Sequence, residues 1–287
     1  MNASATLRDE LAAATTALEA AGVPGARVDA EWLMAGLLDL GRARLRMDLA
    51  RAVPAALAER YADAVRRRAR REPLQRILGW EEFRGLRVRL TDAVLVPRPE
   101  TEALVEWALE LLPPSAGRRR RAIDLGTGSG CIACALAAER ADLDVLAIDL
   151  CPAAAAVARQ NAQALGLASQ ISVVVADLLH GIGGPGADLV VSNPPYLPTA
   201  LVPELLPEVR SHEPTLALDG GVDGLALIRR IAAQARRVLR PSGVLVVETA
   251  GGGQATAAAT LLRAEDFAQV EIRADLAGVT RFVAGRA

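Results

Sequence analysis

The chain has 287 residues, enough for one large domain or two modest ones with real hydrophobic cores. Its formal net charge is −1, and all 33 side chains counted as lysine or arginine are arginine. This balance gives no overall basic field of the kind that indicates nucleic-acid binding. No apolar run free of charge reaches about 18 residues, and the amino terminus lacks a basic segment followed by an apolar one. We therefore expect a cytoplasmic protein without a membrane segment.

The first part of the chain, residues 1–72, predicts a small helical-bundle domain and shows no strand pattern. A break at Pro24-Gly25 separates two predicted helices, and a further helix is expected over residues 55–71. The helical spacing is carried by Leu7, Leu11, Ala14 and Leu18, then by Ala30, Leu33, Met34, Leu37 and Leu38.

Residues 73–98 predict a β-hairpin linker between two domains. Alternating apolar side chains suggest strands over residues 86–90 and 94–96, with a turn at Thr91-Asp92. A helix is expected over residues 100–111, and a loop over residues 113–120 follows it.

Residues 99–287 predict a doubly wound α/β domain, because strand and helix patterns alternate from Arg121 onward. This alternation is typical of a mostly parallel sheet with helices on both faces, and the last two strands would close the sheet, one of them antiparallel. The seven expected strands cover residues 122–125, 144–149, 171–176, 187–192, 243–248, 270–274 and 280–283.

A glycine-rich turn follows the first strand of this domain. The order strand, glycine turn, helix is typical of a nucleotide site. The spacing is Gly-x-Gly-x-Gly instead of Gly-x-Gly-x-x-Gly, which favours a cofactor without a pyrophosphate, such as S-adenosylmethionine. Asp124 could receive its ammonium group, and Asp149, at the end of the second strand, could meet the ribose hydroxyls. The candidate cofactor-binding residues of this region are Asp124, Gly126, Thr127, Gly128, Ser129, Gly130 and Asp149.

The third strand ends at Asp177-Leu178. A carboxylate at this place could accept the adenine amino group, while Leu178 covers the ring. An ordinary turn cap is the alternative interpretation for Asp177, because Asp is common in turns.

The fourth strand ends in Asn193-Pro194-Pro195-Tyr196. The two prolines cannot donate ladder hydrogen bonds, and each holds φ near −65°, so the turn is rigid. It presents a side-chain amide, backbone carbonyls and an aromatic ring. Such a turn suits a planar nitrogen that must be held still, and Asn193 also becomes a candidate for contact with the cofactor.

The sequence resembles the glutamine methyltransferases that modify peptide-chain release factors, the PrmC/HemK family of class I methyltransferases with a Rossmann-like fold. The similarity extends from about Val23 to the end of the chain. Besides the two turns above, the matching segments are residues 73–79, residues 96–102, Glu213-Pro214 with residues 217–225, and residues 275–278.

This resemblance implies transfer of a methyl group from S-adenosylmethionine to the glutamine amide nitrogen in the Gly-Gly-Gln motif of class-one release factors. It implies Asn193, Pro194 and Tyr196 as catalytic residues, with Pro195 and Arg98 joining them in substrate binding. The partners would be release factors, the protein a monomer without stably bound nucleic acid, and residues 1–72 a substrate-recognition domain.

Two other functions stay open. An adenine amino-group methyltransferase acting on DNA or RNA could use the same turn, although such enzymes usually carry a basic recognition domain with aromatic side chains. A nicotinamide-dependent oxidoreductase is disfavoured by the glycine spacing. Two arginine clusters, residues 66–71 and 118–121, are either solvated faces or a grip on an acidic surface of the substrate. No metal site is expected, and Cys131 and Cys134 are expected to pack in the core.

Overall fold

The computed structural model describes residues 5–112 and 117–287. The chain divides into two compact units. The helical unit runs to Trp80 and also includes Leu206–His212, and the sheet unit comprises Glu81–Leu205 and Glu213–Ala287. The start of the expected first domain and part of the expected loop over residues 113–120 lie outside the described residues.

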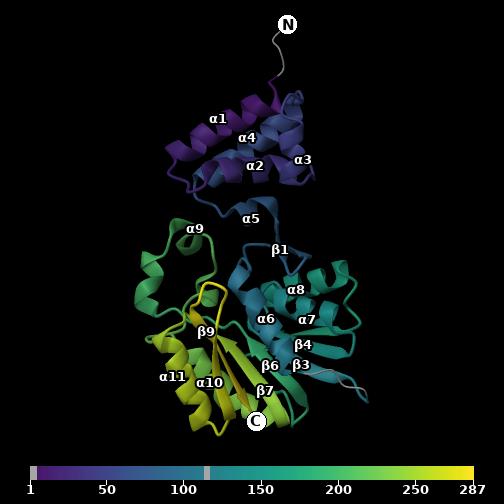
Figure 1. Ribbon diagram of the computed structural model, residues 1–287, viewed down its shortest axis with the longest axis vertical. Coiled ribbons are helices and arrows are strands. Elements are labelled where there is room, and N and C mark those ends of the chain that lie inside the picture. The colour runs from purple at the N-terminus through teal and green to yellow at the C-terminus, as the bar shows by residue number, and fades with distance from the viewer. Residues whose placement is uncertain (1–4, 113–116) are drawn as a thin grey trace. The chain divides into compact units, whose positions relative to one another are not determined.

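The helical unit contains the bundle expected from the sequence (Figure 1). Its core includes the expected apolar residues Leu7, Leu18, Leu33 and Met34, all at most 1% exposed. The hydroxyl of buried Tyr61 donates to the carbonyl of Ala30 at 3.0 Å, so its polar end is satisfied inside the core. The helices are α1 (Leu7–Ala20), α2 (Ala26–Leu37), α3 (Arg42–Met47), α4 (Ala55–Ala69), α5 (Leu74–Leu78) and the short α9 (Pro207–Arg210).

The hairpin in the linker lies earlier than the sequence predicted. Its strands are β1 (Trp80–Phe83) and β2 (Leu86–Arg89), and residues 94–96 form no strand. The turn falls at Arg84 and Gly85, whose φ angles are 48° and 74°. Two positive φ angles at the turn centre are the geometry of a type I′ two-residue hairpin, so the hairpin turn is at Arg84-Gly85. The predicted turn at Thr91-Asp92 does form, with the Val94 amide donating to the Thr91 carbonyl at 3.3 Å, but its assignment to the hairpin was wrong.

The sheet unit contains the seven-stranded, mostly parallel sheet that the sequence predicted. The order of its strands is β5-β4-β3-β6-β7-β9-β8, and β9 runs antiparallel to both of its neighbours. The strands are β3 (Arg120–Leu125), β4 (Leu143–Asp149), β5 (Ile171–Val175), β6 (Ala187–Ser192), β7 (Leu239–Glu248), β8 (Ala268–Ala274) and β9 (Thr280–Arg286).

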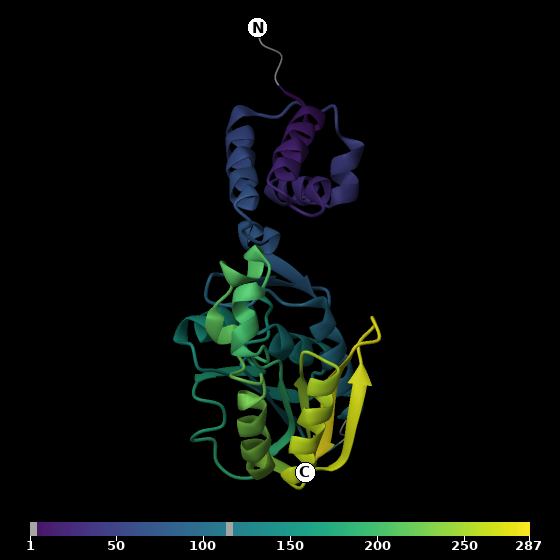
Figure 2. The ribbon, with the colours of Figure 1, turned by 90° about the vertical axis from the view of Figure 1, so that its left-hand side faces the viewer.

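Helices cover both faces of this sheet. On one face, α6 (Pro99–Leu111) and α7 (Cys131–Glu139) form a core with strand residues and with part of α8 (Pro152–Ala164). On the other face, α10 (Ala226–Val238) and α11 (Gly253–Ala264) pack side by side (Figures 1 and 2). Short 3₁₀ turns at Thr199–Glu204 and Thr215–Ala217 complete the unit.

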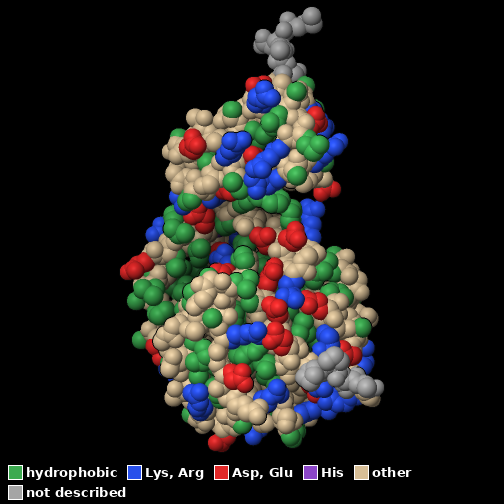
Figure 3. Space-filling model, viewed as in Figure 1, with side chains coloured by type: hydrophobic (Ala, Val, Ile, Leu, Met, Phe, Trp, Pro, Cys, Tyr) green, Lys and Arg blue, Asp and Glu red, His purple; other side chains and the backbone are tan. Residues whose placement is uncertain are grey.

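Charged side chains of both signs are interspersed over the visible surface of the sheet unit (Figure 3). In the part of the chain that the structure describes, no helix combines the length and apolarity needed to cross a membrane.

Candidate functional site

The carboxyl ends of four adjacent parallel strands, β5, β4, β3 and β6, form one edge of the sheet unit. In such sheets ligands bind at this edge, especially where the strand order reverses. The reversal lies between β3 and β6, where Leu125 pairs with Ser192. The glycine turn after β3 and the Asn193 turn after β6 therefore begin side by side.

The glycine turn needs its glycines for two different reasons. Gly126, Gly128 and Gly130 have φ angles of 68°, 54° and 80°, a region that side chains with a Cβ rarely adopt. A Cβ on Gly126 would meet no atom within 4 Å, so its face is open to a ligand. A Cβ on Gly130 would lie 3.0 Å from the Cβ of Ala158, so this glycine permits close packing of α8.

Asp124 is fully buried at the end of β3. Its Oδ2 accepts hydrogen bonds from the Thr127 hydroxyl at 2.6 Å and from the Ala133 amide at 3.2 Å. Its Oδ1 is buried and accepts none within the described residues. Desolvation raises the pKa of this carboxyl to about 7. A buried oxygen without a partner fits a cationic group, as the ammonium of S-adenosylmethionine would be.

Asp149 and Asp177 end the next two strands along this edge. Asp149 Oδ2 accepts from the Gly128 amide and Oδ1 from the Cys151 amide, both at 2.8 Å, so its carboxylate is held beside the glycine turn. Asp177 is half-exposed and forms an ion pair with Arg230 at 2.7 Å. Leu178 adopts a φ of 52° and packs against the core under α10 and α11. The expected cofactor residues thus border one edge, with Asp177 also engaged by an arginine.

Side chains that were not predicted as site residues hold the Asn193 turn in place. The amide nitrogen of Asn193 donates to the hydroxyl of Thr101 at 3.0 Å, and that hydroxyl donates to the carboxylate of Glu248 at 2.9 Å. The backbone carbonyl of Tyr196 accepts from the side chain of Gln254 at 2.8 Å. Thr101 lies in the matching segment at residues 96–102 and Glu248 ends a predicted strand, but no spacing rule connects either with Asn193.

A glycine loop packs against the back of the same turn. A Cβ on Gly220 would lie 2.7 Å from the carbonyl oxygen of Pro195, and one on Gly224 would lie 2.2 Å from that of Tyr196. Neither position can accept a side chain without moving the turn. Backbone hydrogen bonds between Leu197 and Leu218, and between Gly220 and Leu197, add to this support at 3.0 and 2.8 Å.

Tyr196 and Arg98 lie near one another at this end of the unit. Burial raises the pKa of the Tyr196 phenol, and Glu248 raises it further, while Arg281 and Arg98 lower it. Arg98 forms an ion pair with the buried carboxylate of Glu213 at 2.7 Å. Arg98 thus joins the segment before α6 to the loop that follows the Asn193 turn.

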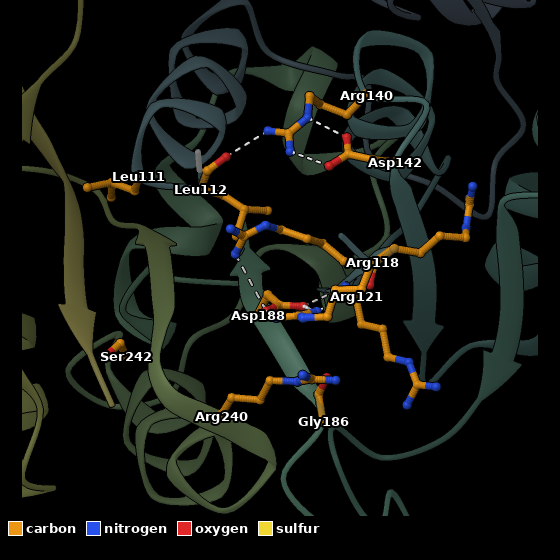
Figure 4. A network of polar contacts seen from close by, with 12 residues as sticks. Leu111, Leu112, Arg118, Arg121, Arg140, Asp142, Gly186, Asp188, Arg240 and Ser242 are labelled. Atoms are coloured by element: carbon orange, nitrogen blue, oxygen red, sulfur yellow. Dashed lines mark hydrogen bonds and ion pairs between the residues drawn. The ribbon is translucent and has the colours of Figure 1, made fainter. Parts of the chain in front are cut away.

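The two arginine clusters are largely neutralised by carboxylates of their own unit. In the sheet unit, Arg118 points to Asp188 (Figure 4). Arg119 pairs with Asp144. In the helical unit the pairs are Arg66 with Asp63, Arg67 with Glu72, Arg68 with Asp29, and both Arg68 and Arg71 with Glu208. Paired arginines match the interpretation of solvated faces better than a grip on an acidic partner.

A cavity of about 290 Å³ opens at the opposite, amino end of the strands. Arg121, Asp144 and Gly186 are among the residues that line it, and none of the predicted site residues does. Among the described residues, no three His, Cys, Asp or Glu side chains are placed to hold a metal ion. Cys131 and Cys134 are buried, and desolvation raises the pKa of both thiols to about 12. Both thiols lie in the core, where a raised pKa disfavours the reactive thiolate.

Two stretches of the chain match known protein families. Residues 9–79 match the family described as the PrmC N-terminal domain, and residues 102–202 match the methyltransferase small domain. Curated relatives extend the similarity over nearly the whole chain. The release factor glutamine methyltransferase of Bradyrhizobium diazoefficiens is 45% identical over 271 residues, 94% of this chain and 91% of the relative. That of Deinococcus radiodurans is 42% identical over 280 residues, 98% of each chain.

Solved structures of methyltransferases share the fold. The catalytic domain of hMettl16 in complex with MAT2A 3'UTR hairpin 6 superposes with a TM-score of 0.59 at 22% identity, covering 78% of this chain and 81% of that one. A methyltransferase from Pyrococcus furiosus gives a TM-score of 0.53 at 16% identity, covering 71% and 89%. At these identities the likeness concerns the fold alone.

Proposed function

We propose that this chain, which belongs to the release factor glutamine methyltransferase family, transfers a methyl group from S-adenosylmethionine to the side-chain amide nitrogen of the glutamine in the Gly-Gly-Gln motif of class-one release factors. One observation carries the proposal. The side-chain amide of Asn193 is anchored at the carboxyl end of β6, next to the strand whose glycine turn and unpartnered Asp124 oxygen fit the cofactor.

When bound, S-adenosylmethionine supplies a methyl carbon made electrophilic by the positive sulfur. We propose that Asp124 receives its ammonium, Asp149 its ribose hydroxyls and Asp177 its adenine amino group, while Leu178 covers the ring. Gly126 and Gly128 would let the backbone approach it closely, and Thr127, Ser129 and Gly130 would complete the binding turn. No anion nest is needed, because the cofactor carries no phosphate.

The Asn193 turn would act on the glutamine. An amide nitrogen is a weak nucleophile because its lone pair is delocalised into the carbonyl. Asn193 Oδ1 and the Pro194 carbonyl would accept its two hydrogens, which orients the lone pair and favours the positive charge that grows on nitrogen. The glutamine nitrogen would accept the methyl group that the cofactor supplies, with the sulfur keeping the electron pair of the broken carbon–sulfur bond, and the nitrogen would then lose a proton to water. Pro195 keeps the turn rigid, and Tyr196 would stack on the flat amide and exclude water.

The remaining parts of the chain would serve recognition. We propose that residues 1–72 form the substrate-recognition domain, that residues 73–98 link it to the methyltransferase domain at residues 99–287, and that Arg98 supports the substrate site. The protein would act as a cytoplasmic monomer without stably bound nucleic acid. The paired arginine clusters support only the absence of stably bound nucleic acid, because a nucleic-acid surface needs cations free to meet phosphates.

The test incubates the purified chain with S-adenosylmethionine labelled in its methyl group and with a recombinant release factor or duplex DNA. We expect label in the release factor, at the Gly-Gly-Gln glutamine when the modified residue is located by mass spectrometry. A release factor with this glutamine changed to alanine is the matched control. Label that enters only DNA would replace the proposal with the adenine methyltransferase alternative.

A further inference from the structure

A buried chain of hydrogen bonds lies beneath the Asn193 turn. Thr101, in α6, and Glu248, the last residue of β7, are each 1% exposed. Strands β6 and β7 are parallel neighbours in which Ser192 pairs with Val247, so Asn193 and Glu248 are the next residues at the same edge. The amide nitrogen of Asn193 bonds to the Thr101 hydroxyl at 3.0 Å, and that hydroxyl bonds to Glu248 Oε2 at 2.9 Å.

We propose that Thr101 and Glu248 are positioning residues, which fix the side-chain amide of Asn193 with its NH₂ turned inward and its oxygen turned toward the substrate. An ionised carboxylate can only accept hydrogen bonds, so the Thr101 hydroxyl must donate its single hydrogen to Glu248. The same hydroxyl oxygen can then only accept from Asn193, and only the NH₂ end of an amide can donate. When Glu248 is ionised, it therefore sets the direction of this whole chain of hydrogen bonds.

The direction matters because the two ends of an asparagine amide have similar size but opposite polarity. With NH₂ bound inward, Oδ1 of Asn193 is left free to accept, and no group of the described residues donates to it. Reversed, the amide would present hydrogens to the hydrogens of the substrate nitrogen, which destabilises the reacting geometry. The catalytic turn thus depends on two side chains that are buried beneath it.

Tyr196, Arg281 and Glu100 also surround Glu248. Desolvation raises the pKa of Glu248 to about 7, Thr101, Arg281 and Tyr196 lower it, and Glu100 raises it. The direction-setting ionised form is therefore increasingly populated above neutral pH. Burial of a carboxylate at this position is costly, and a role in orienting Asn193 would account for its presence.

The first experiment observes the Asn193 amide directly and does not depend on the proposed function. The chain contains only three asparagines, Asn2, Asn161 and Asn193, so labelling asparagine side-chain nitrogen with ¹⁵N gives three NH₂ signal pairs. Asn161 is an internal reference, because its NH₂ donates to the carbonyls of Arg89 and Ser129 at 3.0 and 2.8 Å. Changing Asn193 to serine assigns its signals.

We expect one Asn193 hydrogen to be protected from exchange with water in the ligand-free protein. Thr101→Val, which keeps the shape and removes the hydroxyl, should abolish this protection, and Thr101→Ser should retain it. Glu248→Gln should give intermediate protection, because a glutamine amide can either accept from Thr101 or donate to it. The asparagine signals of Asn161 should not move in any variant.

The second experiment rests on the proposed function and measures kcat on a release factor with cofactor Kd measured separately. Thr101→Val should lower kcat about 10- to 100-fold at unchanged cofactor Kd, and Thr101→Ser should restore it to within a few-fold. Thr260→Val is the matched control, because Thr260 is an exposed helical threonine whose hydroxyl donates to the backbone carbonyl of Thr256 at 3.0 Å, away from the Asn193 turn.

The two experiments distinguish a failure of the positioning role from a failure of the proposed function. Unchanged amide protection in Thr101→Val or in Glu248→Gln would overturn the positioning proposal, and so would a Thr101→Ser variant as slow as Thr101→Val. A wild-type protein that methylates no release factor would overturn the proposed function instead, while the amide signals still decide the positioning role. If Thr101→Val does not fold, Glu248→Gln carries the same test.

Discussion

Gln254 and Tyr196 are 58 residues apart in the sequence, and the side-chain amide of Gln254 donates to the backbone carbonyl of Tyr196 at 2.8 Å. The other end of the same side chain accepts from the Ala250 amide at 2.7 Å. Gln254 lies in the first turn of α11, so it ties the Asn193 turn to a helix that packs on the sheet. Gln254, the last residue of a Gly-Gly-Gln sequence at residues 252–254, therefore has a structural role in this fold.

We expect Gln254→Glu to loosen the Asn193 turn. The carboxylate can still accept from Ala250 but would place an acceptor against the Tyr196 carbonyl. The predicted result is a fall in kcat of about tenfold, which corresponds to one lost hydrogen bond of about 1.4 kcal/mol. Steady-state methylation kinetics measure it. Gln160→Glu, on the exposed face of α8, makes the same chemical change and should leave kcat unaltered.

Asn193→Ala should remove most turnover and little cofactor affinity. Loss of one preorganised polar group at a reacting centre typically lowers kcat by about 10²- to 10³-fold. Calorimetric titration with S-adenosylmethionine would show whether Kd stays within a few-fold of wild type. Normal methylation by this variant would mean that the turn after β6 has been assigned the wrong role.

Asp124→Asn should weaken cofactor binding about 10- to 100-fold, since a charge-assisted hydrogen bond is replaced by an amide that faces an ammonium. In the wild type, the pKa of Asp124 is raised from 3.8 to about 7. An ammonium bound beside it would lower that pKa, so binding near pH 6.5 should release protons. Titrations in buffers of different ionisation enthalpy measure this release, which Asp124→Asn should reduce.

The same pKa predicts a change in stability with pH. Between about pH 4 and 7 the folded, ligand-free protein holds the Asp124 proton more tightly than the unfolded chain, so stability should fall as pH rises through this window. Glu248, whose pKa is also raised to about 7, acts in the same direction. Between pH 4.5 and 7.5, the melting temperature of Asp124→Asn should fall less than that of the wild type. Asp266→Asn, a change at an exposed position, is the control and should follow the wild type.

Glu208→Gln should destabilise the helical unit by roughly 1–3 kcal/mol at pH 7, because it removes a carboxylate that pairs with both Arg68 and Arg71. Despite the opposing effect of desolvation, hydrogen bonds from these arginines lower the pKa of Glu208 to about 2. The stabilisation is therefore present above pH 4.5 and is lost as pH falls toward 2.

Chemical denaturation of the Glu208 variant at neutral and acidic pH measures this difference. The difference in the free energy of unfolding between wild type and Glu208→Gln should become smaller as the solution is acidified. Glu204→Gln is the matched control, because Glu204 is an exposed glutamate that lies outside the helical unit. An equal effect of both variants would show that the ion pairs of Glu208 contribute nothing specific.

The sequence alone was sufficient to predict the architecture of the sheet and the positions of the glycine turn and the Asn193 turn. Helical spacing and strand alternation are local patterns, and the glycine turn and Asn193-Pro194-Pro195-Tyr196 each carry their geometry in neighbouring residues. The hairpin was predicted too late in the sequence for two reasons. A positive φ at Arg84 cannot be seen in a strand pattern. Val94 and Val96 resemble a strand in their spacing, but they pack in a core beside α8.

Only the tertiary structure decided what holds the site. Thr101 lies in α6, Glu248 at the end of β7 and Gln254 in α11. They meet at Asn193 and Tyr196 because the parallel sheet brings strand ends that are distant in sequence to one edge. The ion pairs that neutralise the arginine clusters likewise join residues up to 140 positions apart. Hydrogen bonds between side chains depend on position in space, and a sequence records only the order of the residues.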